Sequence, residues 1–183
     1  LSYRPAIAAK SDGGYIVAWE SKGGPDWDVY VRHLDSAGTP LGEATLAHAT
    51  TQLDQGNASV AVGPGAYFIV CVDTTTNSGA TATGVSCQRM TSSELEPIGP
   101  EILPAPQGSA QAHTALTYLP DGSWVVAWDS EEIDGDGSAI QLQRYSAFGV
   151  GVGQRIVANR SWQGHQSHPV LISTGGAQMG LIV

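Results

Sequence analysis

One repeated pattern constrains the fold of this chain more than any other feature. The pattern consists of Asp-Gly, an aromatic and aliphatic run, and then Ala-Trp-acid-Ser; it occupies residues 12–21 and returns at residues 121–130. A degraded copy lies between them at residues 67–73. A repeat of fixed period indicates an architecture in which one structural unit is used several times.

Four strand-like segments recur in the same order within each unit. The first segments are residues 5–9, 58–62, 114–118 and 169–173, the second carry the pattern above, the third are 29–34, 85–90 and 140–145, and the fourth are 42–46, 99–103 and 153–157. The equivalent residues Ile7, Val60, Leu116 and Leu171 are 53, 56 and 55 positions apart. Four short strands per unit at a period near fifty are typical of β-propeller blades.

We therefore predict an all-β fold of β-propeller type, with four-stranded blades and about three and a half repeats of roughly 55 residues. The single repeat domain, residues 1–183, divides into repeats at 4–56, 57–111 and 112–166 and a partial repeat at 167–183. The second strand is apolar on both faces, so a neighbouring blade must cover each face. We expect further repeats of the same polypeptide, or another protein chain, to supply the missing cover. A β-solenoid or a tandem of sandwiches remains an alternative architecture.

The two cysteines test the pairing of the second and third strands. Cys71 and Cys87 are symmetric about Gly79, and the equivalent pairs are Ala18 with Val31 and Ala127 with Leu142. All three pairs are centred on turn residues, which makes the predicted register self-consistent. We therefore expect a cross-strand disulfide between Cys71 and Cys87, with two free buried thiols as the alternative. A disulfide would place the protein in an oxidising compartment: secreted, at the cell surface or periplasmic.

Composition excludes several classes of partner. The 8 basic residues are scattered singly in a chain of net charge −9. They form no patch that could neutralise phosphates, so neither nucleic acid nor an anionic membrane surface is an expected partner. No apolar run approaches the roughly 18 residues that span a bilayer, so we expect no membrane insertion.

The repeated pattern, followed by a Gly/Asp-rich loop, Gln-Arg-aromatic and a Gly-containing turn, resembles repeats of large secreted bacterial surface proteins. Those proteins often carry calcium-binding or cadherin-like modules, and their repeats are thought to build propeller-like domains. The resemblance covers residues 12–42 and 121–153, whereas the middle unit departs from it, with Val72 in place of Trp. It implies an extracellular scaffold with an adhesive role and no catalytic residues to transfer.

The acidic loop after the second strand of the third unit is the sharpest local signal. Asp129, Glu131, Glu132, Asp134 and Asp136 place five carboxylates in eight residues. Interspersed glycines permit the tight turns of an oxygen-ligand cage, so Asp129, Glu131, Asp134 and Asp136 are candidate calcium ligands. The alternative is a solvated acidic hairpin tip, and no cofactor is required by the pattern.

Aromatic and imidazole side chains supply the other candidates. Trp27 and Trp162 fall in loops, where a ring beside polar groups can stack on a sugar or simply cover a blade edge. Trp19 and Trp128 occupy equivalent strand positions and should be core residues. His113 and His168 share one repeat position, which favours a structural hydrogen bond over a metal ligand.

These observations favour a non-catalytic extracellular propeller module, a binding or assembly scaffold and not an enzyme. Alternatives are a carbohydrate-binding lectin or adhesin, and a structural subunit of a larger complex. A propeller glycosidase is less favoured, because Trp follows the turn Asp by seven residues here and by five in the turn of sialidase-like propellers.

Overall fold

The computed structural model describes residues 2–49, 52–75, 82–104, 110–131, 133–173 and 179–182. These residues form thirteen strands and no helix. Blade 1 consists of β1 (Ser2–Ala9), β2 (Tyr15–Ser21), β3 (Asp28–Leu34) and β4 (Pro40–Leu46). Blade 2 consists of β5 (Asp54–Val62), β6 (Tyr67–Thr75) and β7 (Ala82–Thr91). Blade 3 consists of β8 (Gln111–Tyr118), β9 (Trp124–Glu131), β10 (Ser138–Tyr145) and β11 (Gly151–Val157), and blade 4 begins with β12 (Val170–Ser173) and β13 (Met179–Ile182).

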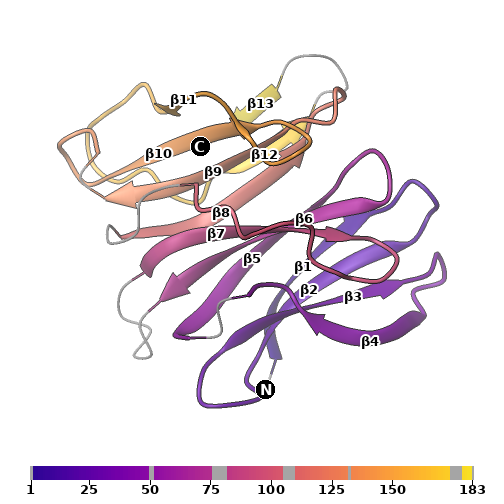
Figure 1. Cartoon of the computed structure of the whole chain (residues 1–183). Helices are drawn as coiled ribbons and strands as arrows, with labels where there is room; N and C mark the ends of the chain where they lie inside the picture. Colours follow the sequence, from indigo (N-terminus) through magenta and orange to yellow (C-terminus); the bar gives the residue numbers. More distant parts are fainter. Residues whose placement is uncertain are drawn as a thin grey trace.

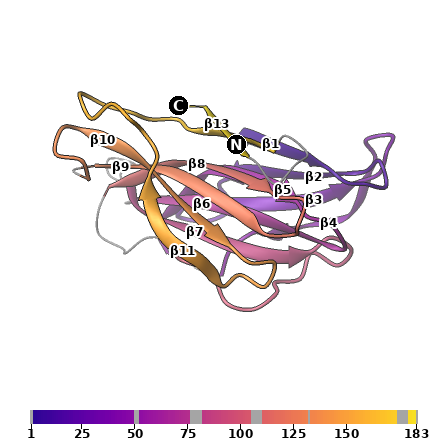
Figure 2. The ribbon, with the colours of Figure 1, turned by 90° about the horizontal axis from the view of Figure 1, so that it is seen from above.

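Each blade is an antiparallel meander, and successive blades pack face to face. Strand order within a sheet follows chain order, from β1 to β4 in blade 1 and from β8 to β11 in blade 3. The first strands of successive blades lie side by side, β1 by β5, β5 by β8 and β8 by β12. Figure 1 shows this progression from the indigo blade 1 to the yellow strands of blade 4, and Figure 2 shows the same sheets from above. The predicted all-β propeller fold is confirmed.

The fourth strand of blade 2 is the main departure from the predicted blade. In place of a strand at 99–103, only two isolated bridges continue the sheet, Cys87 with Ile102 and Met90 with Pro97. Three prolines, Pro97, Pro100 and Pro104, interrupt this segment. Proline has no amide hydrogen to donate to a ladder, so the edge strand does not extend.

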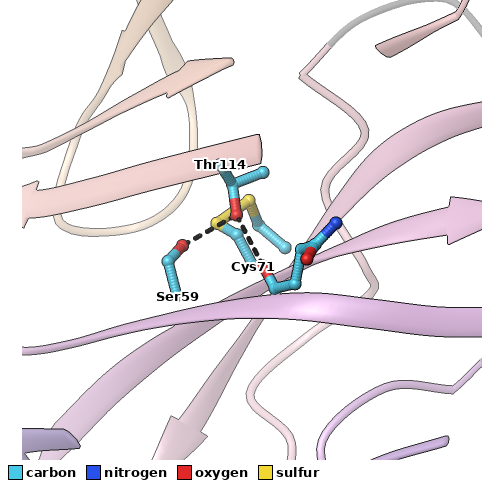
Figure 3. Close-up of a disulfide and its surroundings, with 5 residues drawn as sticks. Ser59, Cys71 and Thr114 are labelled. Carbon is cyan, nitrogen blue, oxygen red and sulfur yellow. Dashed lines mark hydrogen bonds between the residues drawn. A yellow bond between two sulfur atoms is a disulfide. The ribbon is translucent and has the colours of Figure 1, made fainter. Parts of the chain in front are cut away.

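The predicted register of the second and third strands is confirmed in all three blades. Ala18 pairs with Val31, Cys71 with Cys87 and Ala127 with Leu142. Cys71 and Cys87 form the expected disulfide. Figure 3 shows it beside the hydroxyl pair of Ser59 and Thr114, whose oxygens are 2.9 Å apart and join blade 2 to blade 3. The turn centre Gly79 lies outside the described residues.

The core consists of apolar layers between neighbouring blades. One layer joins blades 1 and 2, a second joins blades 2 and 3 around the disulfide, and a third joins blade 3 to Leu171 of blade 4. β6 and β9 are therefore buried on both faces. In β2 only alternate residues are buried.

The repeated tryptophans consequently differ in environment. Trp128 is fully buried in the layer between blades 2 and 3. Trp19, at the equivalent position, is half-buried and stacks on Tyr30 with ring centroids 6.3 Å apart. The prediction that both are core residues is thus wrong for Trp19, because blade 2 covers the opposite face of blade 1.

Two features bear on the protein's surroundings. The disulfide indicates an oxidising compartment. No helix among the described residues is long and apolar enough to cross a membrane.

Candidate functional site

A distorted residue in the first strand of blades 1 to 3, and just before the first strand of blade 4, gives the site its shape. Arg4, Asn57, His113 and His168 occupy the same repeat position, and all four have positive φ values, of 47°, 48°, 53° and 57°. In β1, β5 and β8 the strand register shifts at this point. Such bulges re-aim a side chain and are common beside functional sites.

In blades 1, 2 and 3 one acidic residue of the second strand faces this bulge. Glu20 of β2, Asp73 of β6 and Asp129 of β9 follow the apolar run of the repeat, and all three are buried. Two of them join neighbouring blades. The backbone amide of Asn57 donates to Glu20 Oε1 at 2.7 Å, and the backbone amide of His113 donates to Asp73 Oδ2 at 2.8 Å. Hydrogen bonds from these two backbone amides therefore tie blade 2 to blade 1 and blade 3 to blade 2.

The bulge side chains extend the same network. Arg4 donates to Asn57 Oδ1 at 2.8 Å and lies 3.6 Å from Glu20. Asn57 Nδ2 donates to Asp73 Oδ2 at 2.8 Å. His113 Nδ1 lies 2.7 Å from Asp129 Oδ2. The result is a continuous polar line across three blades.

Asp73 has the most perturbed environment in this line. Burial raises its pKa to about 7, and the nearby Asp129 adds to this effect. Hydrogen bonds from the His113 amide and the Asn57 side chain oppose the rise without cancelling it. A buried acid with a perturbed pKa that lines a cavity is a typical signature of a functional site.

A cavity of about 670 Å³ opens between blades 1 and 2 at this network. Its lining includes the carboxylates of Glu20, Asp54 and Asp73 and the aromatic rings of Tyr3 and Trp27. The two ring centroids are 5.3 Å apart. The site thus combines an aromatic wall with acidic groups, which is the composition of a pocket for a polar ligand with apolar faces.

Blade 2 holds Trp27 at the cavity. Asp54 Oδ1 accepts a bond from the Trp27 amide at 2.8 Å, and the Gln55 amide donates to the Trp27 carbonyl at 2.7 Å. Close packing sets the position of Glu20 as well, because a Cβ on Gly56 would lie only 2.8 Å from Glu20 Oε1. Any larger residue at position 56 would displace that carboxylate.

The candidate calcium ligands each have different contacts in the structure. Asp129 contacts His113, and Glu131 is exposed at the end of β9. Asp134 Oδ2 accepts from Asn159 Nδ2 at 3.0 Å, and Asp136 Oδ2 accepts from the Gly164 amide at 3.1 Å. These two acids therefore anchor the loop that follows β11. Glu132 lies outside the described residues.

The two loop tryptophans also lie in different surroundings. Trp27 lines the cavity between blades 1 and 2, whereas Trp162 is 60% exposed in the loop after β11. A second cavity of about 640 Å³ lies at that loop, and its lining includes Asn159 and His165 but not the Trp162 ring.

Glu20, Asp73 and Asn57 were not among the residues that the sequence singled out. The available signal was the acid that follows the apolar strand in each of the three full repeats. Glu20 and Asp73 are 53 positions apart, so they form no contiguous motif. Only the stacking of blades brings them to one cavity.

No family model matches the sequence, and no curated protein matches it. Solved structures do share its fold. The chain is similar to an endo-arabinase from Bacteroides thetaiotaomicron VPI-5482, with 15% identity and a TM-score of 0.61 over 97% of this chain and 68% of that one. It is similar to a polysaccharide lyase of the ulvan lyase type, with 11% identity and a TM-score of 0.63 over 91% and 46%. It is also similar to a Bacillus subtilis arabinanase, with 16% identity and a TM-score of 0.54 over 95% and 65%.

These similarities establish the propeller fold, and the chain spans 46 to 68% of the length of the three proteins. They also contradict two predictions, that the module is a non-catalytic scaffold and that it is not an enzyme, because the proteins with this fold are named as carbohydrate-active enzymes. The physical reason for the error is that a propeller assembles its polar site from separate blades. The absence of a local catalytic motif in the sequence was therefore no evidence against an enzyme.

Proposed function

We propose that this chain belongs to a carbohydrate-active propeller enzyme that cleaves glycosidic bonds in the cavity between blades 1 and 2. The observation that carries the proposal is the meeting of Glu20 and Asp73 with the rings of Tyr3 and Trp27 in one cavity. The enzymes that share the fold support the same class of substrate.

Hydrolysis of a glycosidic bond commonly uses two carboxyl groups. One protonates the leaving oxygen, and the other activates water or attacks the anomeric carbon. Glu20 and Asp73 contact the backbone amide and the side-chain amide of the same residue, Asn57. They therefore face one small volume from two blades. Asp73, the more deeply buried of the two, has the environment suited to the acid role.

The aromatic wall supplies the binding surface. Sugar rings carry apolar C–H faces and polar hydroxyl edges, and a tryptophan ring can accept the face while neighbouring polar groups bind the edge. Trp27 and Tyr3 offer the rings, and Arg4 and Asn57 lie beside the carboxylates. A glycan partner also agrees with secretion or exposure at the cell surface, which we propose for this disulfide-bonded protein.

A panel of plant and algal polysaccharides tests the activity, with product release measured as new reducing ends. Glu20→Gln and Asp73→Asn, both near-isosteric changes, should each lower kcat/KM at least about a hundredfold, as expected for loss of a general acid or base. Glu94→Gln is the matched control, because Glu94 is exposed on a loop of blade 2. Melting temperatures of all variants separate lost chemistry from lost folding. The proposal fails if the wild-type protein cleaves none of the polysaccharides, or if both variants keep activity within tenfold.

Trp27→Ala tests the sugar-binding wall separately. Removal of the ring should raise KM about tenfold or more and leave kcat less affected, because a stacking ring stabilises the bound sugar in the ground state and the transition state alike. Trp162→Ala, which removes an exposed tryptophan outside the cavity, should leave both constants unchanged. Equal effects of the two substitutions would show that Trp27 is not part of the sugar-binding surface.

A further inference from the structure

Two histidines meet at the bulge position of blades 3 and 4. The rings of His113 and His168 stack with centroids 3.7 Å apart and an angle of 25° between their planes. Asp129, whose side chain is 9% exposed, lies 2.7 Å from His113 Nδ1. His168 is exposed, and its Nδ1 lies 3.0 Å from the hydroxyl of its neighbour Ser167.

The other blades show what the fold itself requires at this position. In blade 1, Arg4 pairs with Glu20; in blade 2, Asn57 donates to Asp73. In blades 1 and 2 each acid thus has one side-chain partner from the bulge of its own blade, in addition to the backbone amide of the next bulge. His113 fills that role for Asp129. Contact between successive bulge residues also recurs, since Arg4 donates to Asn57, but only the pair in blades 3 and 4 consists of two imidazoles.

The donor set is that of a transition-metal site. His113, Asp129 and His168 each offer one ligand atom, and these atoms all lie within 4.8 Å of one another. In the described part of the chain, this is the one group of three or more potential ligands found. Two imidazole nitrogens and one carboxylate oxygen suit Zn²⁺ or Co²⁺, whereas Ca²⁺ prefers six to eight oxygen ligands.

We propose that His113, Asp129 and His168 bind one divalent transition-metal ion, of the Zn²⁺ or Co²⁺ class, that links blade 3 to blade 4. Binding replaces the His113–Asp129 hydrogen bond by two metal–ligand bonds. The exposed His168 ring turns from the stacked arrangement so that its nitrogen points at the ion. Three protein ligands leave a further position of a tetrahedral ion for water.

Titration of the tag-free, metal-stripped protein with Co²⁺ tests the site, with the visible absorption of the bound ion as the readout and Zn²⁺ calorimetry as a second measurement. We expect one ion per chain, displaced by Zn²⁺ and not by Ca²⁺. His113→Asn and His168→Asn should each weaken the affinity at least tenfold. Asparagine is the residue that blade 2 uses at this position with a similar φ, so both variants should fold. His165→Asn, on the loop before blade 4, serves as the control and should bind like the wild type.

Three results would overturn the proposal: no stoichiometric Co²⁺ binding, equal weakening by His165→Asn, or displacement of Co²⁺ by an equal concentration of Ca²⁺. Far-ultraviolet circular dichroism of each variant checks that the fold is retained. Because the titration contains no glycan, its outcome is independent of the activity proposed for the cavity between blades 1 and 2.

Discussion

Replacement of Trp128 by alanine should lower the free energy of unfolding by about 3–5 kcal/mol, the usual cost of removing a fully buried tryptophan. Trp128 lies in the apolar layer between blades 2 and 3, in one cluster with Val126 and both cysteines. Blades on either side hold this layer in place, so the cavity left by the substitution cannot collapse fully. Chemical denaturation followed by fluorescence and circular dichroism measures the loss.

The matched substitution Trp19→Ala should cost much less, about 1–2 kcal/mol, because this ring is half-buried on a face that blade 2 does not cover. The two tryptophans occupy the same position of the repeat, so the difference isolates the effect of the neighbouring blade. Equal losses at the two positions would mean that something covers the outer face of blade 1 in solution.

Removal of the disulfide should cost about 3 kcal/mol, since it closes a loop of sequence separation 16 and restricts the unfolded chain. The informative variant is the double change Cys71→Ala with Cys87→Val. It copies the residues that blade 1 places at the same pair, Ala18 and Val31. The pocket around the bridge is thereby kept filled with side chains that this fold already accepts there.

Denaturant unfolding of the double variant and of the wild type, each with and without a reducing agent, checks this prediction. Reduction should destabilise the wild type by a similar amount and leave the double variant unaffected. A loss below about 1 kcal/mol would show that the bridge adds little to a hairpin already held by its register.

The strand pairing was predictable because it follows from local rules. In each hairpin, alternating side chains and a turn of defined position set which residues face each other, as with Cys71 and Cys87. The strand that was predicted and did not form also has a physical explanation. The edge strand at 99–103 resembles its counterparts in spacing, but its prolines remove donors that the ladder needs.

The polar cavity could not be derived in the same way. Trp27 stood out as a loop tryptophan, yet its partners Glu20 and Asp73 belong to two different repeats and resemble ordinary end-of-strand acids. Asp134 and Asp136 stood out as a dense acidic loop, and they bind the loop after β11. Acidic residues that are close together in the sequence need not bring their carboxylates together in space.

The sequence by itself determined the β-blade unit, its period and the facing cysteines, because strand alternation and turn chemistry act over a few residues. Tertiary structure alone decided which repeated residues became functional candidates. Stacking of blades buries Trp128 and leaves Trp19 half-exposed. It also brings Glu20 to Asp73 and His113 to His168, because packing energy depends on the neighbour that covers a face.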